Sequence, residues 1–273
     1  MTQEKPFTYS EQYLNNQQKP LLLAHRGSRV LGPENTFAAF DIAQSAQADA
    51  LEIDIRLSKD KQLLVFHDET LERVTNGSGK LFDYSLLHLK RLDAAYHFHN
   101  LQGEPYRGRR ITLPTLTELL EAYPDLRINI DIKDNSLLAA RLLAECIAKT
   151  SSEYRTLVGS FHIKVIEYFR QIAPEIPTAA SSKEVASSLL LSKIPKSSLS
   201  VKAAALQIPP NYGWLNLSSP RFIHYLKQQQ KPVHYWTINQ KEDMRRLLSN
   251  GADGIVTDRI DVALNLFQEM GYK

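Results

Sequence analysis

The sequence predicts an α/β fold, a closed (β/α)8 barrel with a small insertion after the second strand. Eight short apolar runs alternate with helical patterns along the 273 residues, and this alternation is typical of βα units on a parallel sheet. Eight such units indicate closure into a barrel. The length suits one barrel, so we expect a single domain over residues 1–273.

The predicted strands and helices follow these patterns in order. The strands cover residues 21–24, 50–55, 127–132, 156–161, 178–181, 203–208, 232–238 and 254–257, of which the fifth has the weakest pattern. Helical patterns cover residues 36–47, 115–122, 137–149, 164–172, 241–248 and 261–270. About 60 residues separate the second strand from the helix at Thr115, whereas βα loops normally have about two to six. We therefore predict an insertion subdomain at about residues 69–113.

Composition and charge restrict the class of protein. The chain is 43% hydrophobic and 23% charged, with a formal net charge of +3, which is unlike a disordered chain or a nucleic-acid binder. The single cysteine, Cys146, excludes an internal disulfide and a thiol metal cluster. No apolar run approaches the ~18 residues that span a bilayer, and residues 1–20 lack the apolar core of a signal peptide. We expect a cytoplasmic protein, with peripheral membrane or lysolipid contact left open and no obligate protein partner.

Acidic residues interrupt two of the predicted strands. Glu52 and Asp54 alternate with aliphatic residues, so period-two geometry places both carboxylates on one face. The next strand repeats the pattern with Asp131 and Lys133. Three carboxylates form an oxygen-only site that favours Mg²⁺, Ca²⁺ or Mn²⁺ over zinc. The alternative is a set of structural ion pairs, such as Asp131 with Lys133 or Arg56 with Glu52.

Two histidines follow apolar runs. His25 ends the first predicted strand, and His67 follows Leu64-Val65-Phe66; catalytic groups lie at such strand ends in barrels. Because histidine titrates near neutral pH, one of the pair can act as a base and the other as an acid. A structural hydrogen-bonding role is the alternative for both.

Charged and aromatic residues lie near the same strand ends. Arg26 and Lys133 would add positive charge, which suits an anionic substrate such as a phosphodiester. Phe161 and Trp236 are candidates to line the substrate pocket, with core packing as the alternative for the tryptophan. Asp258, after the last strand, is most simply a turn or capping residue.

Taken in order, these residues resemble the glycerophosphodiester phosphodiesterase family. The matching motifs run from about residue 21 to residue 258; they are His25-Arg26-Gly27, Pro33-Glu34-Asn35-Thr36, Glu52-x-Asp54, His67-Asp68, Leu113-Pro114-Thr115-Leu116, Asp131-x-Lys133, Trp236-Thr237 and the closing segment 251–258. The resemblance implies a TIM barrel, with the insertion after its second strand.

The resemblance also implies roles for site residues. A divalent cation would be held by Glu52, Asp54 and the acid at 131, and the general acid–base pair would be His25 and His67. Arg26 and Lys133 would contact the phosphate. The family usually has glutamate where this chain has Asp131, so the resemblance leaves the preferred ion open.

The implied reaction is hydrolysis of small glycerophosphodiesters to glycerol 3-phosphate and an alcohol. The nucleophile is either water or a neighbouring hydroxyl of the substrate. Segments 93–98 and 105–108 look like the branch with lysophospholipase D-type enzymes, which release a headgroup alcohol and lysophosphatidic acid from lysophospholipids. Two further alternatives are a metal-free phospholipase C-like barrel and a non-catalytic barrel that binds phosphorylated ligands. The three acids argue against the metal-free barrel, and the pair of histidines argues against the non-catalytic one.

Overall fold

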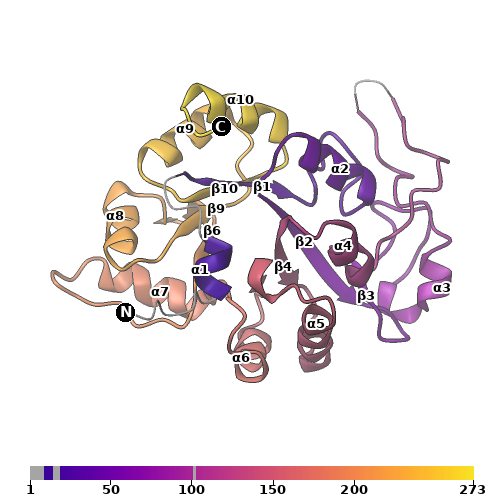
Figure 1. Ribbon diagram of the computed structural model, residues 1–273, viewed down its shortest axis with the longest axis horizontal. Coiled ribbons are helices and arrows are strands. Elements are labelled where there is room, and N and C mark those ends of the chain that lie inside the picture. The colour runs from indigo at the N-terminus through magenta and orange to yellow at the C-terminus, as the bar shows by residue number, and fades with distance from the viewer. Residues whose placement is uncertain (1–8, 15–18, 101–102) are drawn as a thin grey trace, which may run out of the picture.

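The core of the molecule is a parallel sheet curled into a barrel (Figure 1). The computed structural model describes residues 9–14, 19–100 and 103–273. Strands are hydrogen-bonded in the order β5-β4-β2-β1-β10-β9-β6, and every pairing along this path is parallel. The strands are β1 (Leu21–His25), β2 (Ala50–Leu57), β4 (Arg127–Ile132), β5 (Thr156–Gly159), β6 (Leu206–Ile208), β9 (Val233–Tyr235) and β10 (Gly254–Thr257).

An eighth segment closes the barrel between β5 and β6. Val158 forms a parallel bridge with Thr178, and Ala179 forms one with Ala205. The N–H of Ala179 donates to the carbonyl of Val158 at 2.8 Å, and that of Ala204 donates to the carbonyl of Thr178 at 2.8 Å. The weak fifth strand is therefore reduced to two bridging residues, and the predicted (β/α)8 barrel is confirmed.

Some strands are shorter than the sequence predicts. β5 ends at Gly159 instead of residue 161, and β9 ends at Tyr235 instead of residue 238. Phe161 and Trp236 consequently belong to the loops that follow these strands, at the carboxyl end of the barrel.

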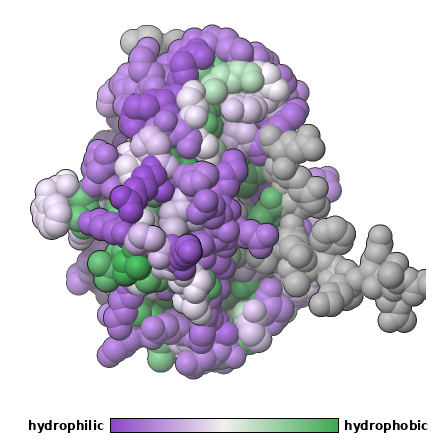
Figure 2. Space-filling model, turned by 90° about the vertical axis from the view of Figure 1, so that its left-hand side faces the viewer, coloured by the Kyte–Doolittle hydropathy of each residue, from purple (hydrophilic) through white to green (hydrophobic). Residues whose placement is uncertain are grey.

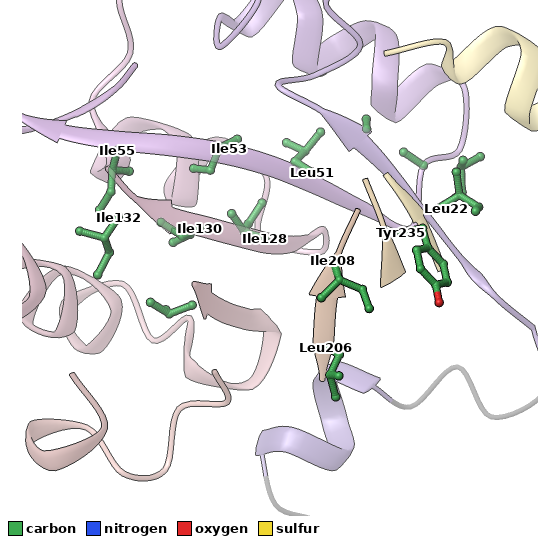
Figure 3. Packing of buried hydrophobic residues seen from close by; sticks show 14 of the residues in the cluster. Leu22, Leu51, Ile53, Ile55, Ile128, Ile130, Ile132, Leu206, Ile208 and Tyr235 are labelled. Atoms are coloured by element: carbon green, nitrogen blue, oxygen red, sulfur yellow. The ribbon is translucent and has the colours of Figure 1, made fainter. Parts of the chain in front are cut away.

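Alternation along β2 and β4 turns aliphatic side chains outwards. Three residues of each strand are partners in the register, and the pairs are Leu51–Ile128, Ile53–Ile130 and Ile55–Ile132. These side chains are buried in the layer between the sheet and the surrounding helices, and Figure 3 shows them side by side along the two strands. Because successive side chains point to opposite faces, Glu52 and Asp54 point into the barrel.

Helices surround the barrel (Figure 1). They are α2 (Phe37–Ser45), α4 (Leu116–Ala122), α5 (Leu137–Lys149), the 3-10 turn η2 (Glu153–Arg155), α6 (Ile163–Ile172), α7 (Ser182–Leu191), α8 (Pro220–Gln228), α9 (Lys241–Ser249) and α10 (Ile260–Glu269). The sequence did not predict α7, α8 or the small hairpin of β7 (Asn211–Tyr212) and β8 (Leu215–Asn216).

The long connection after β2 has an apolar core of its own. β3 (Leu63–Val65) turns back antiparallel to β2, and η1 (Leu81–Asp83) and α3 (Leu86–Leu89) follow before α4. The buried members of this second cluster are Leu64, Phe66, Leu71, Leu81, Leu89, Ala94 and Leu113.

The amino end of the barrel is covered by α1 (Tyr9–Leu14). Tyr13 is fully buried and packs against Leu157, Ala179 and Ala205. None of the described helices is long and apolar enough to cross a membrane. The face seen in Figure 2 is mainly hydrophilic, with small separate hydrophobic patches.

Candidate active site

The predicted site residues meet at the carboxyl ends of β1, β2 and β4. His25 is the register partner of Glu52, and Asp54 is the register partner of Asp131. Neighbouring strands lie about 4.8 Å apart. Side chains from three separate parts of the sequence are therefore brought to one place.

Asp54 lies at the centre of this cluster and is completely buried. Arg26 Nε is 3.0 Å from Asp54 Oδ2, and Lys133 Nζ is 2.9 Å from Asp54 Oδ1. Asn35 Nδ2 also donates to Asp54 Oδ2 at 3.1 Å. Although burial opposes ionisation, the charges of Lys133 and Arg26 hold the pKa of Asp54 below its usual value. Asp54 is thus a carboxylate.

Lys133 links two of the predicted metal ligands. Its Nζ donates to Asp131 Oδ2 at 2.6 Å while it also pairs with Asp54. The Asp131–Lys133 ion pair named as an alternative is therefore present. The other proposed pair is not: Arg56 Nη1 donates to Asp134 at 2.7 Å instead of to Glu52.

Glu52 is the least compensated acid of the cluster. Burial and the neighbouring Asp54 carboxylate raise the pKa of Glu52 to about 7. Its Oε2 is 3.8 Å from His25 Nε2 and accepts no hydrogen bond from the described residues. At this end of the cluster, burial therefore disfavours the ionised form of the acid.

His25 is oriented by Asp258. The two are joined by a hydrogen bond of 2.6 Å between His25 Nδ1 and Asp258 Oδ1. Despite burial, His25 and Asn239 hold the pKa of Asp258 below its usual value, so the carboxylate accepts and His25 Nδ1 carries the proton. His25 Nε2 is then free to exchange a proton at the site. The prediction that Asp258 is only a turn or capping residue was wrong.

His67 is positioned by an antiparallel strand, which the sequence did not predict. β3 is antiparallel, so the rule for the ends of parallel barrel strands does not place this histidine. Instead β2 extends past the barrel rim and β3 returns along it, and the N–H of Phe66 donates to the carbonyl of Asp54 at 2.9 Å. His67 is thereby set next to the acid cluster.

A second aspartate orients His67. Asp68 Oδ1 lies 2.6 Å from His67 Nδ1. Against the effect of burial, hydrogen bonds from His67 and Arg73 hold the pKa of Asp68 well below its usual range. Arg73 also donates to both oxygens of Glu34, at 2.6 and 2.8 Å, and Glu34 accepts from Arg26 at 2.8 Å. The insertion is thus tied by ion pairs to the loop after β1.

Two aromatic side chains stand beside the cluster. Phe161 and Trp236 form an edge-to-face pair with ring centroids 5.9 Å apart. Lys133 Nζ lies 5.7 Å from the Phe161 ring centroid, and Phe161 is 67% exposed. The pair therefore offers an apolar surface next to the charged centre.

The three acids fit a divalent cation in charge and donor type. They offer oxygen donors only, and they outnumber the two cations that pair with them, Arg26 and Lys133. In the described part of the chain, no three His, Cys, Asp or Glu side chains are gathered as an ion would require. If all three acids bound one ion, Lys133 would have to break its ion pair with at least one of the two aspartates.

Comparison with known proteins identifies the family. The model of the glycerophosphoryl diester phosphodiesterase family matches residues 25–262. The chain belongs to this family. A glycerophosphodiester phosphodiesterase of Caldanaerobacter subterraneus subsp. tengcongensis is 33% identical over 258 residues, covering 93% of this chain and 100% of that protein. As a member of the glycerophosphoryl diester phosphodiesterase family, the chain is a phosphoric diester hydrolase, as the sequence predicts.

Other proteins resemble the chain in sequence or in fold. The human lysophospholipase D GDPD1 is 27% identical over 270 residues, covering 86% of this chain and 82% of that protein. A glycerophosphodiester phosphodiesterase structure from Agrobacterium tumefaciens has a TM-score of 0.75 at 26% identity and covers 90% of this chain and 99% of its own. The structure of a phosphodiesterase from Oleispira antarctica in complex with the product sn-glycerol-3-phosphate has a TM-score of 0.76 at 24% identity. The match covers 92% of this chain and 97% of that one.

Several charged neighbours of the histidines hold the site together in ways that the sequence did not predict. The contacts of Asp258, Arg73 and Glu34 are evident only in the structure. One signal was available for Asp258, because it directly follows the last barrel strand and so shares an end of the barrel with His25. Arg73 gave no comparable signal, since it lies within the irregular insertion.

Proposed function

We propose that the chain hydrolyses glycerophosphodiesters to glycerol 3-phosphate and an alcohol, with a divalent cation and two histidines as proton-transfer groups. One observation carries this proposal: two Asp–His pairs, at His25 and His67, lie beside a single cluster of three acids. A barrel that only bound phosphate would have no use for two oriented imidazoles.

The cation would be held by Glu52, Asp54 and Asp131. An oxygen-only set suits Mg²⁺, Ca²⁺ or Mn²⁺, and a bound ion would favour the ionised form of Glu52, whose pKa is raised by burial and by the neighbouring Asp54 carboxylate. When bound, the ion would offset the charge of the phosphoryl oxygens. Arg26 and Lys133 would add positive charge on the same oxygens.

The proton transfers belong to the two histidines. The phosphorus–oxygen bond to the leaving alcohol breaks while a bond forms to the attacking hydroxyl. Attack by water would give glycerol 3-phosphate directly, whereas attack by a neighbouring hydroxyl of the substrate would give a cyclic phosphate, which water then opens to glycerol 3-phosphate. One imidazole takes the proton of the attacking hydroxyl at Nε2, and the other gives its proton to the leaving oxygen. Asp258 and Asp68 keep both rings in the tautomer and orientation that this needs.

The organic part of the substrate would contact Phe161 and Trp236. Their edge-to-face arrangement leaves much of the Phe161 ring exposed beside Lys133. A quaternary ammonium such as choline is attracted to aromatic faces. Glycerophosphocholine is therefore a suitable first substrate.

Turnover of glycerophosphocholine tests the proposal. We expect hydrolysis that is lost on exhaustive chelation and restored by Mg²⁺, Ca²⁺ or Mn²⁺ added in turn. His67→Ala should lower kcat on the order of 10²- to 10⁴-fold without loss of the folded state. Full turnover after chelation would contradict the metal, and near-normal turnover of His67→Ala would contradict the histidine pair.

A further inference from the structure

A chain of charged contacts runs from His67 through Arg73 to Arg26. Asp68 accepts from His67 on Oδ1 and from Arg73 on Oδ2. Arg73 donates in turn to both oxygens of Glu34, at 2.6 and 2.8 Å, and Glu34 accepts from Arg26 at 2.8 Å. Arg73 is thus the link between the side chains around one histidine and those around the arginine of the acid cluster.

The guanidinium of Arg73 holds two carboxylates at once. Its Nε donates to Asp68, while Nη1 and Nη2 donate to the two oxygens of Glu34. Because the guanidinium is planar and its donors form a rigid fork, these bonds fix the two carboxylates relative to each other. A lysine ammonium in the same place would supply the charge without this geometry.

Glu34 is a buried carboxylate between two guanidinium groups. Its side chain is 10% exposed. Although burial opposes its ionisation, hydrogen bonds from Arg73 and the charge of Arg26 hold the pKa of Glu34 below its usual value. Arg73 therefore bonds a carboxylate that also fixes the head of Arg26.

The ring of His67 depends on side-chain contacts for its orientation. The backbone of His67 is held by Arg56, whose Nε donates to its carbonyl at 2.7 Å. This contact fixes the chain but leaves the side-chain torsions of the histidine open. The ring itself is held by Asp68, and Asp68 is held by Arg73 on its other oxygen.

The backbone around Arg73 is anchored in the core of the insertion. Leu71 is fully buried there, and Val74 packs against the same apolar cluster. Thr75 donates to the carbonyl of Leu71 twice, from its N–H at 3.1 Å and from its hydroxyl at 2.8 Å. The side chain of Arg73 is 45% exposed. Since exposed ion pairs add little to stability, loss of Arg73 should disturb the site more than the fold.

We propose that Arg73 is a positioning residue of the reaction. By bridging Asp68 and Glu34, it sets the His67 ring, which would transfer a proton, relative to Arg26, which would bind the phosphate. The inference rests on the proposed function and deepens it, because it adds a residue of the insertion that acts through two carboxylates.

Kinetics of two Arg73 variants test the bridge. Arg73→Ala should lower kcat for glycerophosphocholine roughly 10- to 100-fold, because misplacing a reacting group by about 1 Å can cost about 100-fold. KM should change much less. Arg73→Lys, which keeps the charge but not the fork, should lose most of the same activity. A kcat near the wild-type value in either variant would overturn the proposal.

Arg107→Ala is the matched control. Arg107 also belongs to the insertion, is 38% exposed, pairs with Glu104, and donates from Nε to the carbonyl of Tyr96 at 2.7 Å. This variant removes comparable contacts away from the site and should keep the wild-type kcat, while thermal melting verifies that all variants fold. A loss as large as that of Arg73→Ala would indicate a general effect on the insertion and would count against the bridge.

A double variant tests whether Arg73 acts through Asp68. Asp68→Asn alone should lower kcat, because the amide no longer holds the ring as a carboxylate does. Losses that pass through one contact do not multiply, so Asp68→Asn combined with Arg73→Ala should lose clearly less than the product of the two single losses. A loss equal to that product would refute the coupling.

Nitrogen NMR of labelled histidines separates this proposal from the proposed function, since it needs no turnover. In wild type the neutral His67 ring should carry its proton on Nδ1, in Arg73→Ala both tautomers should be populated, and Arg107→Ala should match wild type. The signal is identified by its absence in His67→Ala. Absence of glycerophosphocholine turnover in wild type would refute the proposed function alone. An unchanged His67 tautomer in Arg73→Ala would refute the positioning role, whatever the turnover.

Discussion

At the scale of single residues, two histidines share one arrangement. An aspartate binds Nδ1 of His25 and another binds Nδ1 of His67, both at 2.6 Å. The two aspartates come from different places, since Asp68 is the next residue in the chain and Asp258 is 233 residues away from His25. The same tautomer is therefore fixed twice by independent contacts.

Asp258→Asn tests the orientation of His25. An amide cannot hold the imidazole as an ionised carboxylate does, so we expect kcat for glycerophosphocholine to fall on the order of 100-fold, with a smaller change in KM. Steady-state kinetics measures both. Asp253→Asn is the control, because the side chain of Asp253, before the same strand, accepts a hydrogen bond from the backbone N–H of Val233. A kcat within about twofold of wild type for Asp258→Asn would contradict the role.

At the scale of elements, the turn between β1 and α2 positions the first part of the site. Arg26, Gly27 and Ser28 have positive φ angles of 51°, 79° and 77°. At Gly27 a Cβ atom would lie 2.8 Å from both Ala39 Cβ and Phe40 Cδ1. The turn therefore needs glycine for its backbone and for its packing on α2.

Gly27→Ala should lower the free energy of unfolding by about 2–5 kcal/mol. Strained backbone contributes about 1–2 kcal/mol, and overpacking against α2 about 1–3 kcal/mol. Urea denaturation measures the change. Gly108→Ala is the matched control, because Gly108 has φ of 73° and a Cβ atom added there would meet no described atom within 4 Å; it should cost only the backbone part. Equal losses in both variants would show that the packing argument fails.

Elements differed in how well the sequence predicted them. β2 and β4 were predicted nearly to their ends, because alternation of aliphatic and acidic residues is a local signal. α7 and α8 were missed, although Ser181 with Glu184 forms a capping box and Ser219 with Pro220 makes a typical helix start. The serines within α7 weakened the helical signal of a segment whose start was marked.

At the scale of the whole molecule, the barrel interior contains a buried histidine. His234 on β9 is 1% exposed, and Gln207 Nε2 lies 3.3 Å from its Nδ1. Its ring also occupies the space where a side chain at Gly254 would begin, with Cδ2 2.8 Å from an added Cβ. Burial lowers the pKa of His234 from 6.5 to about 4.

This buried histidine should make stability depend on pH. Above pH 6.5 it is neutral in both states, whereas between pH 6.5 and 4 only the unfolded state binds the proton. The free energy of unfolding should therefore fall as the pH is lowered through this range, by up to about 3 kcal/mol from His234 alone. Denaturation of His234→Gln should show a weaker fall, while the exposed His224→Gln should follow wild type. Parallel curves for wild type and His234→Gln would contradict this.

The sequence by itself determined the barrel and the identity of its central acids and histidines. Strand periodicity and the order of short motifs are local properties, so Glu52, Asp54, His25 and His67 could be singled out without coordinates. Their catalytic and metal-binding roles remain proposals.

Only the tertiary structure decided how these residues are held. In the folded chain, His25 is hydrogen-bonded to Asp258, and Lys133 lies between Asp54 and Asp131. β3 runs antiparallel to β2, which places His67 next to the acids. A pocket of about 910 Å³ likewise combines residues near 30, 98 and 259. Contacts between residues so distant in sequence depend on the packing of whole elements, and no local pattern specifies them.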